Sequence, residues 1–106
     1  MVRPEDFRSV VRRGRRSASS LAVYYRLERE IGDPIRFGFI VSRAVGGAVE
    51  RNLLRRRMRA IGRQFVDAGA GGTDVVVRAL PGSAQRDWAS LSADMHDALD
   101  SPLMSR

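Results

Sequence analysis

Six arginines lie within thirteen consecutive positions, from Arg51 to Arg63, in a segment with the spacing of an amphipathic helix. Successive helical residues are rotated by about 100°, so one narrow arc holds the apolar side chains Leu54, Met58, Ile61 and Phe65. A neighbouring arc holds the polar side chains Arg51, Asn52, Arg55, Arg56, Arg59 and Arg63, and the far side holds Arg57 and Leu53. Like charges four residues apart repel each other on an isolated helix, and Glu50 is the only acid close by. We expect the apolar arc to pack on a sheet and the basic arc to bind a polyanion rather than form an ordinary solvated face.

Side chains for protein-based catalysis are scarce in this sequence. The absence of cysteine excludes disulfides, thiolate metal sites and a cysteine nucleophile. His96 is the only histidine and stands near Asp94 and Asp97, where we expect a solvated surface residue. The glycines in 69–72 lack the Gly-Lys-Ser/Thr that cradles a nucleotide phosphate. We therefore expect no catalytic residues and no metal site in the protein itself.

The net charge of +7 is unevenly distributed along the chain. Residues 1–66 carry sixteen arginines against six acids, whereas residues 67–106 carry three arginines against six acids. Such an excess attracts polyanions from a distance, and each phosphate that is neutralised releases condensed counterions. Nucleic acid is the partner that this charge favours.

The remaining elements are those that must position the basic helix. Residues 4–13 predict a short helix, because Pro4 suits its first turn and Gly14 can end it in a left-handed conformation. Alternating apolar residues predict strands at 19–27 and 35–41, joined as a hairpin by the turn at 32–34. Residues 17–20 either begin the first strand or form an additional short one.

The second half of the chain predicts two helices and one strand. A helix from 48 to 68 is followed by a valine-rich strand at 73–79. A last helix at 84–100 has an apolar stripe for the core, formed by Trp88, Leu91, Met95 and Leu99. We see no repeat and no dividing linker, so the prediction is one α+β domain over residues 1–106, with helices packed on a small mixed sheet. No segment has the length of a membrane span, which predicts a cytoplasmic protein without a membrane partner.

Residues 42–59 resemble the signature of the bacterial ribonuclease P protein family. The family pattern is a Ser-Lys-Lys-like turn, then Gly-Asn-Ala-Val, then Arg-Asn-Arg and further basic residues on a helix. The matching residues here are Ser42-Arg43, Gly46-Gly47-Ala48-Val49 and Arg51-Asn52, with Arg55, Arg56, Arg57 and Arg59 following. Upstream Glu5-Asp6-Phe7 with Gly14, and downstream Val77-Arg78-Ala79, also match, so the resemblance covers nearly the whole chain. The sequence departs from the pattern at Val11, Ala44, Gly47 and Leu53.

The resemblance implies a fold and a division of labour. The fold would be that of the second domain of a small-subunit ribosomal protein, in the order αββ(β)αβα and with a left-handed βαβ crossover. The protein would bind the catalytic RNA of ribonuclease P and the 5′ leader of precursor tRNA, promoting endonucleolytic 5′ maturation of tRNA, with one protein per RNA and no DNA partner. Catalysis would belong to the RNA, which would bind most of the Mg²⁺.

The resemblance also implies which residues bind RNA. Catalytic-RNA contacts fall on Arg51, Asn52, Arg55, Arg56 and Arg59, to which the helical projection adds Arg63. Leader contacts fall on Phe7, Arg12, Arg13, Tyr25, Arg43 and Arg78.

Several assignments stay open at this point. Phe7 and Tyr25 fit the core as well as a leader cleft, and Tyr24 is the reserve candidate for the cleft. We expect Trp88 in the core rather than on a stacking platform. A ribosomal RNA-binding protein is a second reading of the charge and fold. A DNA-binding or membrane-surface helix is less favoured, because the arginine-rich segment lies between predicted strands.

Overall fold

The computed structural model describes residues 2–30 and 32–100 of the chain. Its elements follow the order helix, three strands, helix, strand and helix. Of the two alternatives for residues 17–20, an additional short strand forms, but at Arg15–Ala18. The elements are α1 (Pro4–Arg13), β1 (Arg15–Ala18), β2 (Ala22–Glu28), β3 (Arg36–Ile40), α2 (Ala48–Asp67), β4 (Thr73–Ala79), the 3-10 turn η1 (Ser83–Gln85) and α3 (Trp88–Asp100). The α+β prediction is confirmed. The last helix begins at Trp88 rather than near residue 84, because residues 83–85 form the separate turn.

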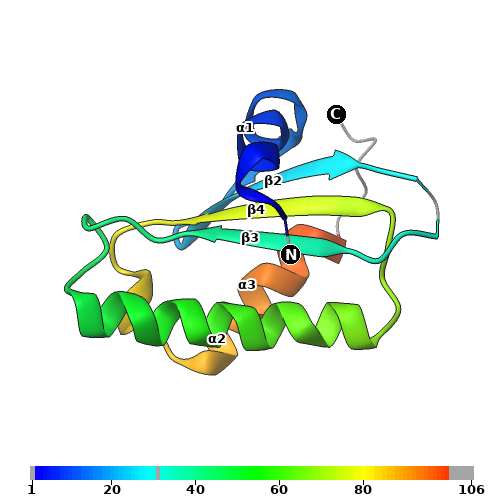
Figure 1. Cartoon of the computed structure of the whole chain (residues 1–106). Helices are drawn as coiled ribbons and strands as arrows, with labels where there is room; N and C mark the ends of the chain where they lie inside the picture. The colour runs from blue at the N-terminus through cyan, green and yellow to red at the C-terminus, as the bar shows by residue number, and fades with distance from the viewer. Residues whose placement is uncertain (1, 31, 101–106) are drawn as a thin grey trace.

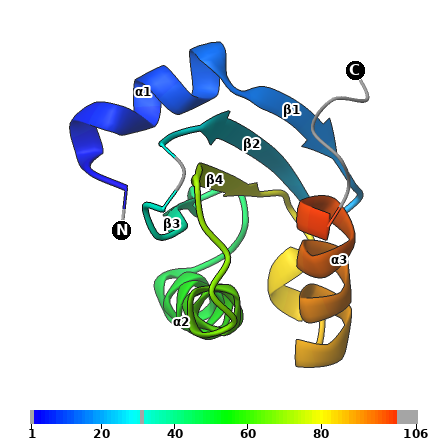
Figure 2. The same cartoon turned by 90° about the vertical axis from the view of Figure 1, so that its right-hand side faces the viewer.

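The single sheet separates two layers of helices (Figures 1 and 2). Helix α1 lies on one face, and α2 and α3 lie on the other. Each face has its own apolar core: Leu54, Ile61 and Val77 belong to the core under α2 and α3, whereas Val10 and Val76 belong to the core under α1. The sheet therefore presents two surfaces with different coverings, and any function on one face is physically separated from the other.

The predicted hairpin between the strands at 19–27 and 35–41 is wrong. β2 pairs antiparallel with β4, and β4 pairs parallel with β3, so the strand order is β1-β2-β4-β3. The segment before β4 enters between the two expected partners: Arg29 N–H donates to the Gly72 carbonyl at 2.6 Å, and Gly72 N–H donates to the Asp33 carbonyl at 2.8 Å. The hairpin that does form joins β1 to β2.

Strand β4 takes the central position because its apolar run is continuous. Val75, Val76 and Val77 are fully buried, which requires a covered sheet face on both sides. Strand β3 has partly exposed side chains such as Phe39 and Ile40, which suit an edge. The three consecutive valines are the feature of the sequence that indicates a strand at the centre of the sheet.

Helix α2 connects the parallel strands β3 and β4, which are adjacent in the sheet. The two views together show this β3–α2–β4 connection to be left-handed (Figures 1 and 2). Such connections are right-handed in nearly all proteins. The unusual handedness is the one that the family resemblance implies.

Gly14 ends α1 in an unexpected way. Its backbone is extended, with φ −76° and ψ 163°, rather than left-handed. A β-carbon at this position would collide with the Val10 carbonyl oxygen and lie 2.8 Å from the Arg26 carbonyl oxygen. Glycine is therefore required by the close approach of the helix end to β2.

Candidate nucleic-acid interface

The apolar arc predicted for α2 is buried as expected. Leu54, Met58, Ile61 and Phe65 are at most 7% exposed and pack in the core under the sheet. The neighbouring arc faces outward over the whole helix. We call the side chains on it the α2 stripe; they are Arg51, Asn52, Arg55, Arg56, Arg59 and Arg63.

Two arginines of the α2 stripe are held by polar groups of the protein. Arg51 Nε donates to the Gly46 carbonyl at 3.1 Å, which joins the helix to the loop before it. Arg55 donates to the Asn52 side-chain oxygen at 3.0 Å and to the Val41 carbonyl at 3.4 Å. These bonds orient the guanidinium groups without neutralising them, because the acceptors are uncharged.

Acids are nearly absent around the α2 stripe. Among the described residues, Arg63 is the only stripe arginine with an acidic partner, Asp67 at 3.1 Å. Glu50 is turned away from the arginines, because it accepts hydrogen bonds from Gly47 N–H at 2.9 Å and from Gln85 at 3.2 Å. The stripe thus keeps most of its positive charge available to a ligand.

The far side of α2 has a structural role. Arg57 donates to the Arg86 carbonyl at 3.1 Å, which ties the helix to the segment before α3. Leu53, which departs from the family pattern, is 37% exposed on this side of the stripe. The missing charge at this position therefore lies at the margin of the basic surface.

On the opposite face of the sheet, Phe7 lies at the boundary between the core and the surface. Its ring packs directly over Gly38 of β3, where a β-carbon would collide with the ring. The side chain is half-buried against the core under α1. Gly38 was not predicted as part of the site, although a glycine inside a strand often marks such a close approach.

Tyr25 is a core residue with a charged cover. It is 7% exposed and packs with Val10 and Val76, while the guanidinium carbon of Arg78 lies 5.9 Å from the centroid of its ring. Arg78 is itself exposed on this face. Tyr24 lies on the other face, where its hydroxyl donates to Asp94 at 2.6 Å, so the structure does not support it as a cleft candidate.

The other arginines predicted for this face are exposed but dispersed. Arg12 and Arg13 lie in the last turn of α1, and Arg43 lies in the loop between β3 and α2. None of them has an acidic partner among the described residues. Arg16 was not predicted: it stands opposite Tyr25 in the β1–β2 register and is exposed on the same face. We call Phe7, Tyr25, Arg16 and Arg78 together the α1-side surface.

A buried carboxylate anchors α1 over this surface. Asp74 accepts two hydrogen bonds from Arg36, at 2.8 and 2.6 Å, and also pairs with Arg29 at 3.3 Å. Arg36 reaches on to Asp6 of α1 at 3.6 Å. Hydrogen bonding to Asp74 raises the pKa of Arg36. The network thus contacts the first turn of α1, the turn that carries Phe7.

Two ring-bearing residues of α3 were singled out from the sequence. Trp88 was expected in the core but is 39% exposed at the start of α3. The side chain of His96 is 43% exposed, as expected for a surface residue, and its ring also stacks on Phe65 with 4.4 Å between the ring centroids. Neither residue lies on the α2 stripe or the α1-side surface.

Two further findings concern residues 2–30 and 32–100. No group of three His, Asp or Glu side chains in these ranges is placed to hold a metal ion. No helix within them has the length and apolar character of a bilayer-spanning segment.

The fold and the surfaces define a class: a small basic α+β protein with separate arginine-bearing surfaces on the two sides of one sheet. The sequence model of the family described as Ribonuclease P matches residues 1–102. The ribonuclease P protein components of Clavibacter michiganensis and Streptomyces avermitilis are 43% and 45% identical to this chain. The matches cover 89% and 92% of this chain, and 83% and 85% of those proteins. The chain therefore belongs to the ribonuclease P protein family, and so to the ribonucleoprotein endoribonuclease of tRNA processing.

Solved structures confirm the fold. The RNase P protein from Thermotoga maritima superposes with a TM-score of 0.84 at 23% identity, covering 96% of this chain and 99% of that one. The Staphylococcus aureus RNase P protein gives a TM-score of 0.82 at 22% identity, covering 94% and 91%.

Proposed function

We propose that this protein binds the catalytic RNA of ribonuclease P through the α2 stripe and the 5′ leader of precursor tRNA through the α1-side surface. In doing so it promotes the endonucleolytic 5′ maturation of tRNA. The observation that carries the proposal is that the α2 stripe belongs to a helix on one face of the sheet, whereas the α1-side surface lies on the face that α1 covers. Figure 2 shows α1 and α2 on opposite sides of this sheet. A protein with this arrangement can hold two RNA segments at once.

The α2 stripe is suited to a folded RNA. Guanidinium groups bind phosphate oxygens through two parallel hydrogen bonds, and a regular helix holds them at fixed spacing. Arg56 and Arg59 are exposed and have no acidic partner among the described residues, so RNA phosphates need not displace a protein acid. Counterion release on phosphate binding then drives association.

The α1-side surface is suited to a single strand. Unstacked bases bind aromatic side chains, and a nearby positive charge follows the backbone. Phe7 offers a half-buried ring for stacking, and Arg78 offers a guanidinium above Tyr25. Arg12, Arg13 and Arg43 would add phosphate attraction around the surface.

Hydrolysis is assigned to the RNA subunit in this proposal. The protein offers no paired nucleophile and base in either surface, whereas phosphodiester cleavage by bound metal ions needs only RNA ligands and water. Mg²⁺ would therefore be bound mainly by the RNA. We further propose one protein per RNA, no DNA partner, and action in the cytoplasm, where the precursor tRNA must be met.

A reconstitution experiment tests this assignment. The purified protein alone should not cleave precursor tRNA, and addition of a bacterial ribonuclease P RNA at low Mg²⁺ should give cleavage that the RNA alone performs poorly. Protein-only turnover that survives stringent RNase-free controls would contradict the proposal.

A ribosomal role is the rival that shares this charge and fold. Sequencing the RNA that co-purifies with the tagged protein separates the two. Ribonuclease P RNA should dominate, and a predominantly ribosomal RNA yield would favour the rival.

A further inference from the structure

We propose that the groove between α2 and the edge strand β3 binds one unpaired nucleotide of the RNA partner, with its base stacked on Phe39 and its phosphate held by Arg59 and Arg63. The inference rests on the proposed binding of ribonuclease P RNA by α2. It adds a base-stacking subsite to a helix to which the sequence assigns only polar contacts.

The groove is a hollow of about 350 Å³ beside the stripe. Its lining combines apolar side chains with two guanidinium groups: Ile35, Phe37, Phe39, Arg59, Gly62, Arg63 and Val66. The size lies at the lower end of the range for small-ligand sites. Because β3 is the last strand of the sheet, no further strand covers this side of the groove.

Phe39 is backed by a rigid row of aromatic rings. It stacks on Phe37 with 5.7 Å between centroids and 6° between ring planes. Phe37 in turn contacts Phe65 of α2 at 5.9 Å. Phe37 and Phe65 are buried, whereas Phe39 at the end of the row is only partly buried. A nucleobase in the groove would extend an existing stack and would require little rearrangement.

The charge of the groove fits a phosphate. Arg59 is exposed and has no acidic partner among the described residues. Arg63 pairs with Asp67, but the two side chains are 75% and 64% exposed, so this ion pair is weak and a phosphate can compete for the guanidinium. Val66, 40% exposed, gives the groove an apolar rim between the base and the solvent.

The groove is continuous with the α2 stripe. Arg59 also lines a second hollow, of about 480 Å³, over the first turns of α2; its lining is Val49, Asn52, Leu53, Arg55, Arg56 and Arg59. An RNA segment bound along the stripe would therefore meet the groove at Arg59. The shared arginine is the argument for a nucleotide of that same RNA as the occupant.

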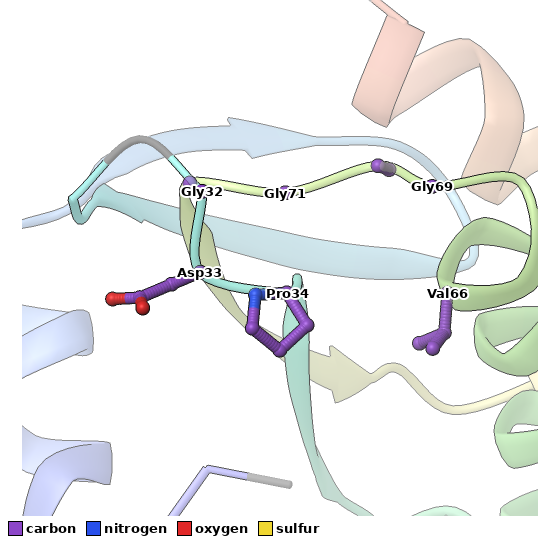
Figure 3. Close-up of a pocket in the computed structure, with 8 residues that line it drawn as sticks. Gly32, Asp33, Pro34, Val66, Gly69 and Gly71 are labelled. Atoms are coloured by element: carbon purple, nitrogen blue, oxygen red, sulfur yellow. The ribbon is translucent and has the colours of Figure 1, made fainter.

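The basic path ends at Val66. Beyond it lies a third hollow between the 32–34 turn and the glycine-rich 69–72 segment (Figure 3). That hollow has no arginine in its lining and includes Asp33, whose carboxylate extends away from Val66 in the close-up. The nearest guanidinium, that of Arg29, already pairs with Asp33 at 3.2 Å. A phosphate would have to compete with this carboxylate, so the subsite favours one nucleotide over a longer strand.

The test is the affinity of the intact protein for ribonuclease P RNA without precursor tRNA, so that leader binding does not contribute. Val66→Asp places a negative charge at the exposed rim without altering the core and should weaken binding at least tenfold. Gln64→Asp, on the far side of the same turn, introduces the same charge and should change binding less than twofold. Equal effects of the two variants would overturn the proposal.

Phe39 variants test stacking directly. Phe39→Leu should weaken binding at least fivefold, because base–aromatic stacking is worth about 1–3 kcal/mol and 1.4 kcal/mol is tenfold. Phe39→Trp should bind like the natural protein. Wild-type affinity of Phe39→Leu, or an equal loss in Phe39→Trp with an unchanged melting temperature, would overturn the subsite.

Failure of the subsite is distinguishable from failure of the proposed function. Arg55→Ala/Arg56→Ala removes stripe charges outside the groove. Loss of affinity in this variant with none in Val66→Asp would refute the groove and leave the proposed function intact. No specific binding of ribonuclease P RNA by the natural protein would refute the proposed function itself.

Discussion

Phe7 and Gly38 show how single residues shape the α1-side surface. The ring of Phe7 occupies the space that a side chain at position 38 would need. The strand backbone thus forms the floor on which the ring rests, and the remaining exposed part of the ring is available to a base. The backbone of Gly38 is not in the left-handed conformation that favours glycine. Glycine is required at this position by the close packing of the Phe7 ring.

Gly38→Ala should therefore disturb the α1-side surface specifically. The added methyl group must displace the Phe7 ring, and overpacking of this kind costs about 1–3 kcal/mol. Denaturant unfolding should show that loss of stability, and affinity for leader-bearing precursor tRNA should fall while affinity for ribonuclease P RNA is retained. Unchanged stability would show that Phe7 does not pack as described.

Tyr24 gives a prediction for alkaline pH. Burial, together with the hydrogen bond to Asp94, raises the pKa of Tyr24. The folded state thus favours the protonated phenol of Tyr24. The contribution of Tyr24 to the free energy of unfolding is therefore complete below the ordinary tyrosine pKa of about 10 and is lost as the pH rises above it. The stability of the natural protein should begin to fall near pH 10 and continue to fall as the pH rises further.

Tyr24→Phe is the matched control for that titration. It should lose about 1 kcal/mol at neutral pH with the hydrogen bond, and its stability should decline less over the same alkaline range. Parallel declines in urea unfolding series for the two proteins would contradict the role of Tyr24.

At residue scale, the sequence predicted the positions of side chains correctly where they depend on the geometry of a single helix. The polar arc from Arg51 to Arg63 follows from helical rotation alone, and the structure places these side chains on one stripe, in which all are exposed except the partly buried Arg51 and Arg55. Gly38 and Arg16 depend on strand pairing and packing between elements, which no single segment encodes. Tyr25 could not be assigned for the same reason, because its burial depends on α1.

At the scale of elements, the Asp74 network joins β3 to β4 and reaches α1 through one exposed ion pair. Asp74 on β4 binds Arg36 on β3, and Arg36 reaches Asp6 on α1. Asp74 is nearly buried, whereas Asp6 is 40% exposed. The two carboxylates should therefore differ greatly in their contribution to stability.

Asp74→Asn should destabilise the protein by about 3 kcal/mol, because it leaves two guanidinium groups without their buried partner. Asp6→Asn should cost less than about 1 kcal/mol, as expected for an exposed pair. Thermal or denaturant unfolding of the two variants provides the comparison. Equal losses would contradict the central position of Asp74 in the network.

Element types were predictable from the sequence, but strand pairing was not. Helices α1 and α2 follow from local periodicity and end signals, β2 and β3 follow from alternation, and β4 follows from its run of valines. The pairing of β2 with β4 depends on a crossover through α2, so the strands nearest in sequence are not neighbours. The turn at 32–34 has the composition of a hairpin turn. In the structure, however, the backbone of Gly72 forms hydrogen bonds with Arg29 and Asp33, so that the segment before β4 separates β2 from β3.

At the scale of the whole molecule, the uneven charge of the sequence becomes two basic surfaces, the α2 stripe and the α1-side surface. Helices α2 and α1 lie on opposite sides of the sheet (Figures 1 and 2). Arg43 lies in the loop that connects β3 to α2, and so belongs to neither the α2 stripe nor the α1-side surface. Under the proposed function, this separation would allow catalytic RNA and leader to bind without competing for the same arginines. The two binding activities should therefore be separable by mutation.

The most direct test is precursor tRNA and ribonuclease P RNA binding by two variants, Arg55→Ala/Arg59→Ala on α2 and Phe7→Leu/Arg78→Ala on the other face. The first should weaken binding to ribonuclease P RNA and flatten its salt dependence by up to about two phosphate equivalents. The second should assemble normally with the RNA and lose about 1–3 kcal/mol of affinity for leader-bearing precursor tRNA, with no loss for tRNA that lacks the leader. Equal losses by the second variant for leader-bearing and leaderless tRNA, at an unchanged melting temperature, would contradict two separate RNA-binding surfaces.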